Sequence, residues 1–468
     1  MGTVIDKYKD EDDSNLSWRY LILSPQNGGV WELMRYALLG DSHSFCRFVD
    51  TNYDNVPSLV SPVPHHRWII FLSILLRKII AFFAKPMDWI GCFLDFLLNL
   101  LSQNANFFGL LYNLLHEKTY VSFDLQMHFV DFYNCWNDFQ KETSTQVFIL
   151  CDKAKYANLV LVSFRGTEPF NADDWSTDFD YSWYEIPKVG KVHMGFLEAL
   201  GLGNRLEPST FYFNLQGKNR RKSRSTDDVS NGAYSSKHNS EPLFPCIESD
   251  ADQSFISETP PKKTKVTAYW TVRSKLKNLL EENKDAKFMV TGHSLGGALA
   301  ILFLTVLVIH EEEEIMERLL GVYTFGQPRI GDRKLGRFME GHLQHPLPKY
   351  FRVVYCNDLV PRLPYDDKTF LYKHFGVCLY YNSFYIEKEV EEEPNKNFFG
   401  IRFILSKHLN AVWELIRGLT IGWVEGADYK EGWFRMLFRV IGLVLPGISA
   451  HCPTDYVNSI RLGKESSI

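Results

Sequence analysis

The 468-residue sequence predicts an α/β fold with a mainly parallel central sheet, together with an N-terminal amphipathic helical region. Two observations predict the α/β part. A short apolar run leads into the motif GHSLG at 292–296 and then into an Ala/Leu-rich stretch, and strand-like segments alternate with helix-like ones around it. A third observation, the nearly continuous apolar composition of residues 68–101, predicts the helical region.

The motif at 292–296 stands between a strand-like run and a helix, which is typical of the nucleophile elbow of an α/β hydrolase. In such an elbow a strained turn holds the serine hydroxyl above the sheet, and glycines leave room for the strand and the helix to cross. The helix that begins after Ser294 directs free N–H groups at the charge that develops during acyl transfer. The motif therefore predicts a nucleophile at Ser294.

Composition narrows the function classes. The formal net charge is −5, and the sequence has no glycine-rich phosphate loop or Cys/His zinc spacing, so nothing indicates nucleic-acid or zinc binding. The eight cysteines are scattered and include no C-x-x-C, as expected for core thiols in a reducing compartment. Residues 1–13 are charged and lack the apolar core of a secretory signal, so we expect a cytosol-facing protein.

Residues 68–101 lie in an N-terminal region, 1–119, and predict two helices separated at Pro86, each with a narrow polar stripe and a wide apolar side. The first would reach only about 24 Å, against about 30 Å for the core of a bilayer. Arg77 and Lys78 also lie near its middle, where charges are costly in a membrane span.

We therefore expect the helices to lie on a lipid surface, with Trp68 and Trp89 at the boundary and Arg77 and Lys78 facing lipid headgroups. The alternative interpretation is a helical pair buried against the core of the same protein.

The α/β-hydrolase domain is predicted at 120–468. Residues 216–265 are basic and then rich in Ser, Asp, Asn and Pro, and such a segment cannot bury enough apolar surface to offset its ordering entropy, so a disordered insertion is expected. Helices are expected at 267–280 and within 398–445, and strands at 146–150, 159–164, 288–290, 321–325 and 350–355.

A serine hydroxyl needs a histidine to take its proton and a carboxylate to orient that histidine, and in α/β hydrolases the carboxylate precedes the histidine in the chain. Asp358 follows the strand that ends at 355 and precedes two prolines that fix the backbone, while Asp332 and Asp366 are alternatives. For the base, position alone leaves His374 and His451 open, with weaker candidates at 342, 345 and 408.

Five motifs occur together and in order: FRGT at 164–167, VHMGF at 192–196, GHSLGGA at 292–298, FGQPR at 325–329 and NDLVPRLP at 357–364. With these motifs the sequence resembles the class 3 lipases, the family of the fungal triacylglycerol lipases. The apolar segment ahead of the motifs, the long insertion and ISAHCPTDY at 448–456 more closely resemble the plant oil-body lipases.

The resemblance implies Ser294 as the nucleophile, Asp358 as the orienting acid and His451 as the general base. It also implies an oxyanion hole made by Thr167, through its N–H and hydroxyl, and by the backbone N–H of Leu295.

The same resemblance places a lid at about 168–183, where Phe170 and Trp175 would cover the site in water and move onto lipid. The stretch is unusually acidic for a lid, with aspartates at 173, 174, 178 and 180.

The resemblance thus implies a triacylglycerol lipase that needs no metal or cofactor and works at the cytosolic side of a lipid-droplet (oil-body) surface, or at the endoplasmic reticulum membrane. Alternatives are a phospholipase A1 or galactolipase with the same triad, and a lipase-like signalling scaffold without catalysis. If residues 68–101 only dock the enzyme, deleting them should preserve hydrolysis of a soluble ester and abolish co-flotation with lipid droplets.

Overall fold

The computed structural model describes residues 19–40, 46–51, 64–102, 127–166, 171–216, 266–366, 372–398, 400–426, 429 and 431–465. In this part of the chain the larger sheet has nine strands in the order β13-β12-β11-β10-β9-β8-β5-β4-β3. They are β3 (His128–Asn137), β4 (Glu142–Cys151), β5 (Leu159–Phe164), β8 (Lys287–His293), β9 (Leu319–Phe325), β10 (Tyr350–Tyr355), β11 (Val377–Tyr381), β12 (Ile386–Val390) and β13 (Lys464–Glu465).

The five middle strands, from β5 to β11, are parallel, and antiparallel strands flank them on both sides. The predicted strands all lie in this sheet, and their alternation with helices gives the predicted α/β-hydrolase arrangement. The helices that pack around it are α10 (Ala268–Glu282), α11 (Leu295–Ile309), α12 (Glu313–Met316), α13 (Arg333–Leu343), α14 (Ile404–Val424), α15 (Trp433–Gly442), α16 (Pro446–Ser449) and α17 (Pro453–Leu462).

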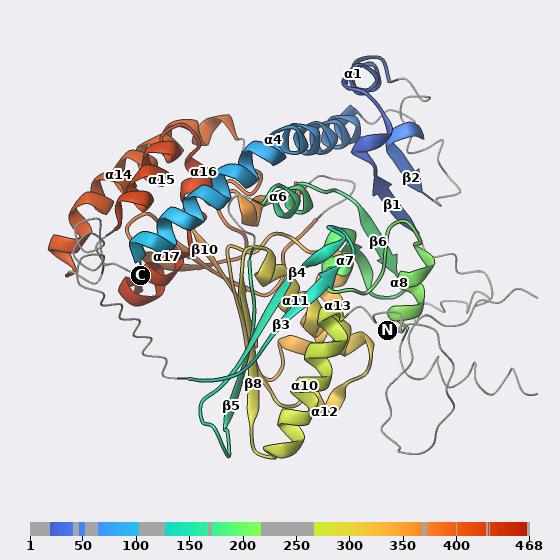
Figure 1. Cartoon of the computed structure of the whole chain (residues 1–468), viewed down its shortest axis with the longest axis vertical. Coiled ribbons are helices and arrows are strands. Elements are labelled where there is room, and N and C mark those ends of the chain that lie inside the picture. The colour runs from blue at the N-terminus through green and yellow to red at the C-terminus, as the bar shows by residue number, and fades with distance from the viewer. Residues whose placement is uncertain are drawn as a thin grey trace, which may run out of the picture.

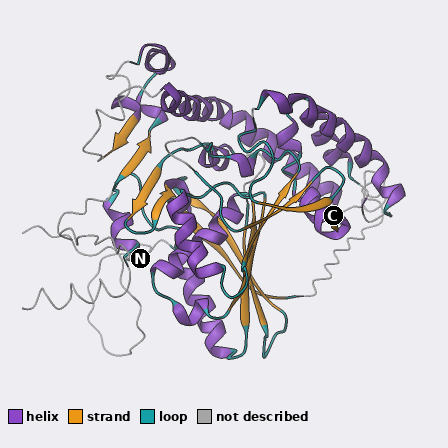
Figure 2. Ribbon diagram, turned by 180° about the vertical axis from the view of Figure 1, so that it is seen from behind, coloured by secondary structure: helices purple, strands orange, loops and turns teal. Residues whose placement is uncertain are grey.

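Figures 1 and 2 show α10, α11 and α13 on one side of the sheet and α14 to α17 on the other. α11 packs on β5, β8 and β9 and is buried from Leu295 to Leu307, which explains why this helix is apolar on all sides. The predicted helix at 267–280 is α10, and the predicted helical region 398–445 holds α14 and α15.

A second, antiparallel sheet has the order β2-β1-β6-β7 in the described residues. Its strand β1 comes from the N-terminal region and pairs with β6, so the N-terminal residues pack as part of the catalytic unit. The predicted boundary near residue 120 lies outside the described residues, as does nearly all of the predicted insertion. The remaining elements are β1 (Tyr20–Leu23), η2 (Pro25–Asn27), α1 (Val30–Leu39), β2 (Val49–Thr51), α4 (Pro64–Ser102), α6 (Ala172–Asp178), β6 (Trp183–Ile186), β7 (Gly190–His193), α7 (Met194–Ala199), α8 (Ser209–Asn214), η3 (Val360–Arg362) and η4 (Ile401–Phe403).

The prediction of two helices in residues 68–101 is wrong, because α4 is a single helix of 39 residues that continues through Pro86. Proline removes one backbone hydrogen bond. Pro86 lies on the exposed side of α4, where water can hydrate the carbonyl group that loses its donor. Among the described residues, no helix combines the length and the apolarity that a membrane span requires.

The orientation of α4 also differs from the prediction. Its polar stripe faces the protein, since Ser73 and Arg77 are buried together with Ile70 and Ile74. Lys78 donates to the carbonyl oxygen of Gly28 at 2.6 Å. Because Arg77 is buried against the protein, its guanidinium group is not available to lipid headgroups.

The outward side of α4 is instead apolar. Trp68 is 50% exposed, and Phe82 and Trp89 are 78% and 77% exposed. The predicted positions of the two tryptophans at the surface thus agree with the structure, while the predicted role of the polar stripe does not.

Candidate active site

Ser294 occupies the sharp turn between β8 and α11, with a φ of 57° and a ψ of −130°. This conformation is strained for a residue with a side chain, as expected at a nucleophile elbow. The surrounding glycines permit it: a Cβ on Gly292 would lie 2.2 Å from the carbonyl carbon of Gly296, and one on Gly166 would lie 2.4 Å from the carbonyl oxygen of His293. Gly292, and Gly166 of the FRGT motif, are therefore required by close packing.

The structure brings Ser294, His451 and Asp358 together from three distant segments. The Nε2 atom of His451 lies 2.7 Å from the Oγ atom of Ser294, and its Nδ1 atom lies 2.7 Å from the Oδ2 atom of Asp358. All three side chains are buried, Asp358 completely. A hydroxyl, an imidazole and a carboxylate in this order can activate the hydroxyl as a nucleophile.

Tyr456, which sequence reasoning did not single out, donates its hydroxyl hydrogen to the Oδ2 atom of Asp358. The N–H group of Val360 donates to the other carboxylate oxygen at 2.9 Å. Burial, and then the charge of Asp358, raise the pKa of Tyr456 well above its usual value, so the phenol stays protonated and remains a donor. Its one sequence signal was its position in the motif at 448–456 that also carries His451.

His293 supports the backbone of His451, the predicted base. Burial lowers the pKa of His293 well below its usual value, so the ring is neutral, and its Nε2–H group donates to the carbonyl oxygen of His451 at 3.0 Å. The two imidazole rings lie 4.6 Å apart between their centroids. The second residue of the GHSLG motif therefore positions the loop that carries the predicted base.

The backbone at the start of α11 is arranged to receive negative charge. The carbonyl oxygen of Ser294 accepts from the N–H group of Gly297 at 2.9 Å, so the helical hydrogen bonds begin there. The N–H group of Leu295 is in the first turn, where N–H groups have no acceptor within the helix. Thr167 and Phe170 lie outside the described residues, so the second oxyanion donor and the first lid residue stay predictions.

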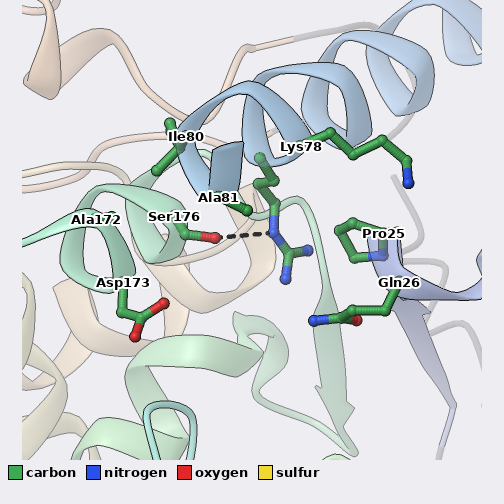
Figure 3. Close-up of a pocket in the computed structure, with 9 residues that line it drawn as sticks. Pro25, Gln26, Lys78, Ile80, Ala81, Ala172, Asp173 and Ser176 are labelled. Carbon is green, nitrogen blue, oxygen red and sulfur yellow. Dashed lines mark hydrogen bonds between the residues drawn. The ribbon is translucent and has the colours of Figure 1, made fainter. Parts of the chain in front are cut away.

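Trp175 lies beside the triad on the short helix α6, with its ring centroid 6.4 Å from that of His451. α4 packs directly on α6, and Arg77 donates to the Oγ atom of Ser176 at 3.2 Å, the bond dashed in Figure 3. The hydroxyl of Ser73 donates to the carbonyl oxygen of Phe179 at 2.7 Å. A pocket of about 210 Å³ remains between η2, α4 and α6. The predicted lid segment is thus held by the N-terminal helix.

One of the four aspartates of this segment, Asp180, has a structural explanation. Asp180 is completely buried and lies 2.9 Å from guanidinium nitrogens of both Arg77 and Arg205. Burial alone would raise the pKa of Asp180, but the two guanidinium groups outweigh it and hold the pKa below its usual value. Asp180 therefore stays charged and joins α4 to the end of the α6 segment.

The other acids and histidines considered from the sequence serve different roles. Asp332 caps α13 by accepting from the N–H group of Leu335, and Asp366 pairs with Lys373. The Nε2–H group of His374 donates to the carbonyl oxygen of Pro361 at 2.7 Å, which is the packing role expected of it. The remaining three histidines, at 342, 345 and 408, are exposed.

The sequence is similar to known lipases. A family model described as Lipase (class 3) matches residues 161–368. The chain is 51% identical to triacylglycerol lipase OBL1 of Nicotiana tabacum, over 96% of this chain and 95% of that protein. It is 46% identical to triacylglycerol lipase OBL1 of Arabidopsis thaliana, over 98% and 99% of the two chains.

Among solved structures, it resembles a lipase from Rhizopus microsporus var. chinensis at 22% identity, with a TM-score of 0.33 over 55% of this chain and 61% of that one. The near-complete coverage of the plant relatives confirms the family that the five motifs predicted and the plant branch that the apolar segment, the insertion and the motif at 448–456 predicted: the chain belongs to the class 3 lipase family, in the branch of the plant OBL1 lipases.

Proposed function

We propose that this chain is a carboxylic ester hydrolase, a triacylglycerol lipase that releases fatty acids from acylglycerols at the surface of lipid droplets. The observation that carries the proposal is the hydrogen-bonded series Ser294, His451 and Asp358 at the carboxyl end of a parallel sheet. The plant relatives, which are named triacylglycerol lipases and align over nearly the whole chain, support the substrate class.

In the first half of the proposed reaction, the Oγ atom of Ser294 attacks the ester carbonyl carbon while its proton passes to the Nε2 atom of His451. Asp358 holds the imidazole by its Nδ1–H group and stabilises the imidazolium. The N–H group of Leu295, with the predicted donor Thr167, stabilises the oxyanion. The tetrahedral intermediate then expels the glycerol oxygen, which takes the proton from His451, and a diacylglycerol leaves.

In the second half, His451 takes a proton from water as the water oxygen attacks the acyl-enzyme. The ester bond to Ser294 breaks, its oxygen regains the proton from His451, and the fatty acid is released. One ester and one water give one acid and one alcohol. The groups that move protons and hold charge in these steps are all side chains or backbone N–H groups.

The direct test is Ser294→Ala on emulsified triolein, which should reduce fatty-acid release by about 10⁴-fold or more. Ser209→Ala, at an exposed serine, is the matched control and should retain the rate. Release by the Ser294 variant at the control rate would rule out this active site. Parallel assays with phosphatidylcholine and galactolipid separate the lipase from a phospholipase A1 or galactolipase, and no release from any substrate would leave the scaffold interpretation.

The outward side of α4 supports docking on lipid, because its tryptophans and Phe82 are exposed along one face. Deletion of the helix is not a usable test, since α4 also buries Ile70 and Ile74 in a core cluster with β1 and β6. Substitutions on the outward face of α4 therefore test lipid docking in place of the deletion.

Phe82→Ser with Trp89→Ser should lower co-flotation with lipid droplets while hydrolysis of a soluble short-chain ester is retained. Tyr156→Ser is the control, because Tyr156 is 87% exposed in the loop before β5, at the opposite end of the parallel strands from the triad. Equal flotation of both variants would exclude α4 as the docking element.

A further inference from the structure

α14 exposes apolar side chains along its whole length. The residues concerned repeat every three or four positions and are between 46% and 89% exposed; they are Leu405, Leu409, Val412, Ile416, Leu419 and Trp423. This spacing places them on one stripe of the helix. A helix of a protein surrounded by water normally turns such a stripe toward the core.

The charged residues of α14 lie on the opposite stripe and are buried: Lys407, Glu414 and Arg417 are each 8% exposed or less. No other Asp, Glu, Lys or Arg occurs between 404 and 424. Glu414 and Arg417 both hydrogen-bond the Tyr355 hydroxyl at the end of β10. α14 is therefore inverted, with charge inside and apolar surface outside.

α15 repeats the inversion. Its two charged residues, Arg435 and Arg439, are buried, and Arg439 lies 2.7 Å from Asp455 of α17. The exposed residues of α15 and of the turn after it are apolar: Leu437, Val440, Ile441, Val444 and Leu445. Two adjacent helices with the same inversion form one continuous face, which we call the α14–α15 face.

The position of this face connects it with the active site. Both helices contact α16, and His451 follows that short helix by two residues. Figures 1 and 2 show α14, α15 and α4 at the same end of the molecule. The α14–α15 face therefore belongs to helices that pack on the segment leading to His451.

We propose that the α14–α15 face is a second lipid-docking surface that seats the protein on the surface of an acylglycerol droplet. Lipid is the partner that fits, because the face is apolar and the charged side chains of both helices are buried beneath it. The proposal rests on the proposed function because the acylglycerol of the droplet is the proposed substrate. Binding to the droplet does not itself require catalysis.

The test is a triple variant, Leu405→Ser, Leu419→Ser and Trp423→Ser, compared with wild type in flotation with phosphatidylcholine-stabilised triolein droplets. The ratio of bound to free protein should fall about tenfold or more, while the rate on a soluble short-chain ester stays within about twofold. The matched control is Tyr156→Ser, Leu320→Ser and Leu347→Ser, three exposed side chains at the amino ends of parallel strands. Unchanged flotation of the first variant overturns the proposal and leaves the lipase assignment intact.

A second measurement does not depend on how the triple variant folds. Droplets coated with brominated phosphatidylcholine should quench more fluorescence in wild type than in Trp423→Phe, since Trp423 is 89% exposed on the face. Equal quenching overturns the proposal. Sedimentation without lipid tests the alternative that a second copy of the chain binds the α14–α15 face. If the wild type is a dimer and the triple variant is a monomer, the face is a self-association interface and the lipid-docking proposal is overturned.

Discussion

Asp358 accepts hydrogen bonds from three groups, and this explains how one carboxylate can fix the orientation of a loop histidine. The donors are the imidazole of His451, the hydroxyl of Tyr456 and the N–H group of Val360. A buried carboxylate is costly unless its oxygens are satisfied, and here both oxygens have partners. The orientation of the predicted base therefore depends partly on Tyr456, which holds the carboxylate that contacts the imidazole.

Tyr456→Phe removes one of these donors without changing the shape of the side chain. A hydrogen bond to a charged group contributes about 1.5–3 kcal/mol, so kcat on a soluble ester should fall about tenfold or more while KM stays unchanged. Tyr381→Phe, which loses a hydroxyl contact with Glu387, is the control. Equal kcat values for the two variants would show that Tyr456 does not position Asp358.

Gly326 lies against the triad, where a larger side chain would not fit. Its φ is +58°, and a Cβ would lie 2.9 Å from the Tyr456 hydroxyl, 3.0 Å from Asp358 and 3.1 Å from His451. Gly326→Ala should therefore lower kcat by about tenfold or more, because the three side chains must shift. Gly341→Ala, in α13 with open space around it, should leave kcat unchanged and raise the free energy of unfolding by about 0.5–1 kcal/mol.

The sequence located the members of the site with very different ease. Ser294 was evident from its motif, because the elbow needs glycines at fixed positions. Asp358 could be named only among alternatives, and spacing did not separate His451 from His374, since a histidine in a loop carries no periodic signal. Tyr456 was missed because its partner is 98 residues away in the chain.

At the scale of elements, a buried ionic cluster joins α14, α15 and α17. Asp455 lies at its centre and contacts Arg417, Arg435 and Arg439, and the carboxylates of Glu414 and Glu431 balance the remaining charge. The cluster lets two helices bury their charged sides. It therefore explains how α14 and α15 can present apolar sides to their surroundings.

Asp455→Asn should lower the free energy of unfolding by about 3–5 kcal/mol, because it leaves buried guanidinium groups without their counter-ion. Glu425→Gln, at an exposed carboxylate after α14, should have almost no effect. Denaturant unfolding of the two variants measures both values. Similar midpoints for both variants would mean that the cluster contributes little.

The same cluster predicts a pH dependence. Burial alone would raise the pKa of Asp455, but Arg435, Arg439 and Arg417 outweigh it and lower the pKa. Because the pKa of Asp455 is lower in the folded than in the unfolded chain, its charge stabilises the fold fully above the unfolded pKa, at about pH 4. This stabilisation is lost as the pH falls toward the pKa of the folded state. The wild type should therefore lose stability below about pH 4 more steeply than Asp455→Asn, as thermal unfolding across pH would show.

Elements were predicted well where periodicity decides them and poorly where distant partners do. The Val- and Ile-rich strands and α10 appear at the expected positions. The polar stripe of α4 was assigned to lipid, because its partner Asp180 is 103 residues from Arg77 in the chain. The apolar composition of 398–445 predicted helices, but which side of each would be buried depends on Asp455, which lies beyond that region.

At the scale of the whole molecule, α1, α4, α14 and α15 lie along the upper edge of the view in Figure 1, with α1 near one corner and α14 near the other. The short helix α16, which ends two residues before the predicted base His451, packs on α14 and α15. The exposed side chains of α1, α4, α14 and α15 are largely apolar, whereas the chain as a whole carries a net charge of −5. Attraction between opposite charges therefore contributes little to the proposed docking, and apolar burial dominates.

This predicts that flotation with triolein droplets changes less than about twofold between 0.05 and 0.5 M NaCl, because salt screens only charge interactions. Replacing part of the phosphatidylcholine by anionic phosphatidylserine should not strengthen binding. A steep loss of binding with salt would instead indicate a basic docking patch.

The distance along the chain between the members of the triad has a consequence during synthesis. A ribosome that has completed the segment of Asp358 must add 93 more residues before the imidazole exists, and α14 and α15 lie within that stretch. The hydroxyl of Ser294 in the nascent chain therefore lacks its predicted base until both inverted helices have been synthesised. The order of translation therefore delays ester cleavage until α14 and α15, which we propose bind the droplet surface, have been synthesised.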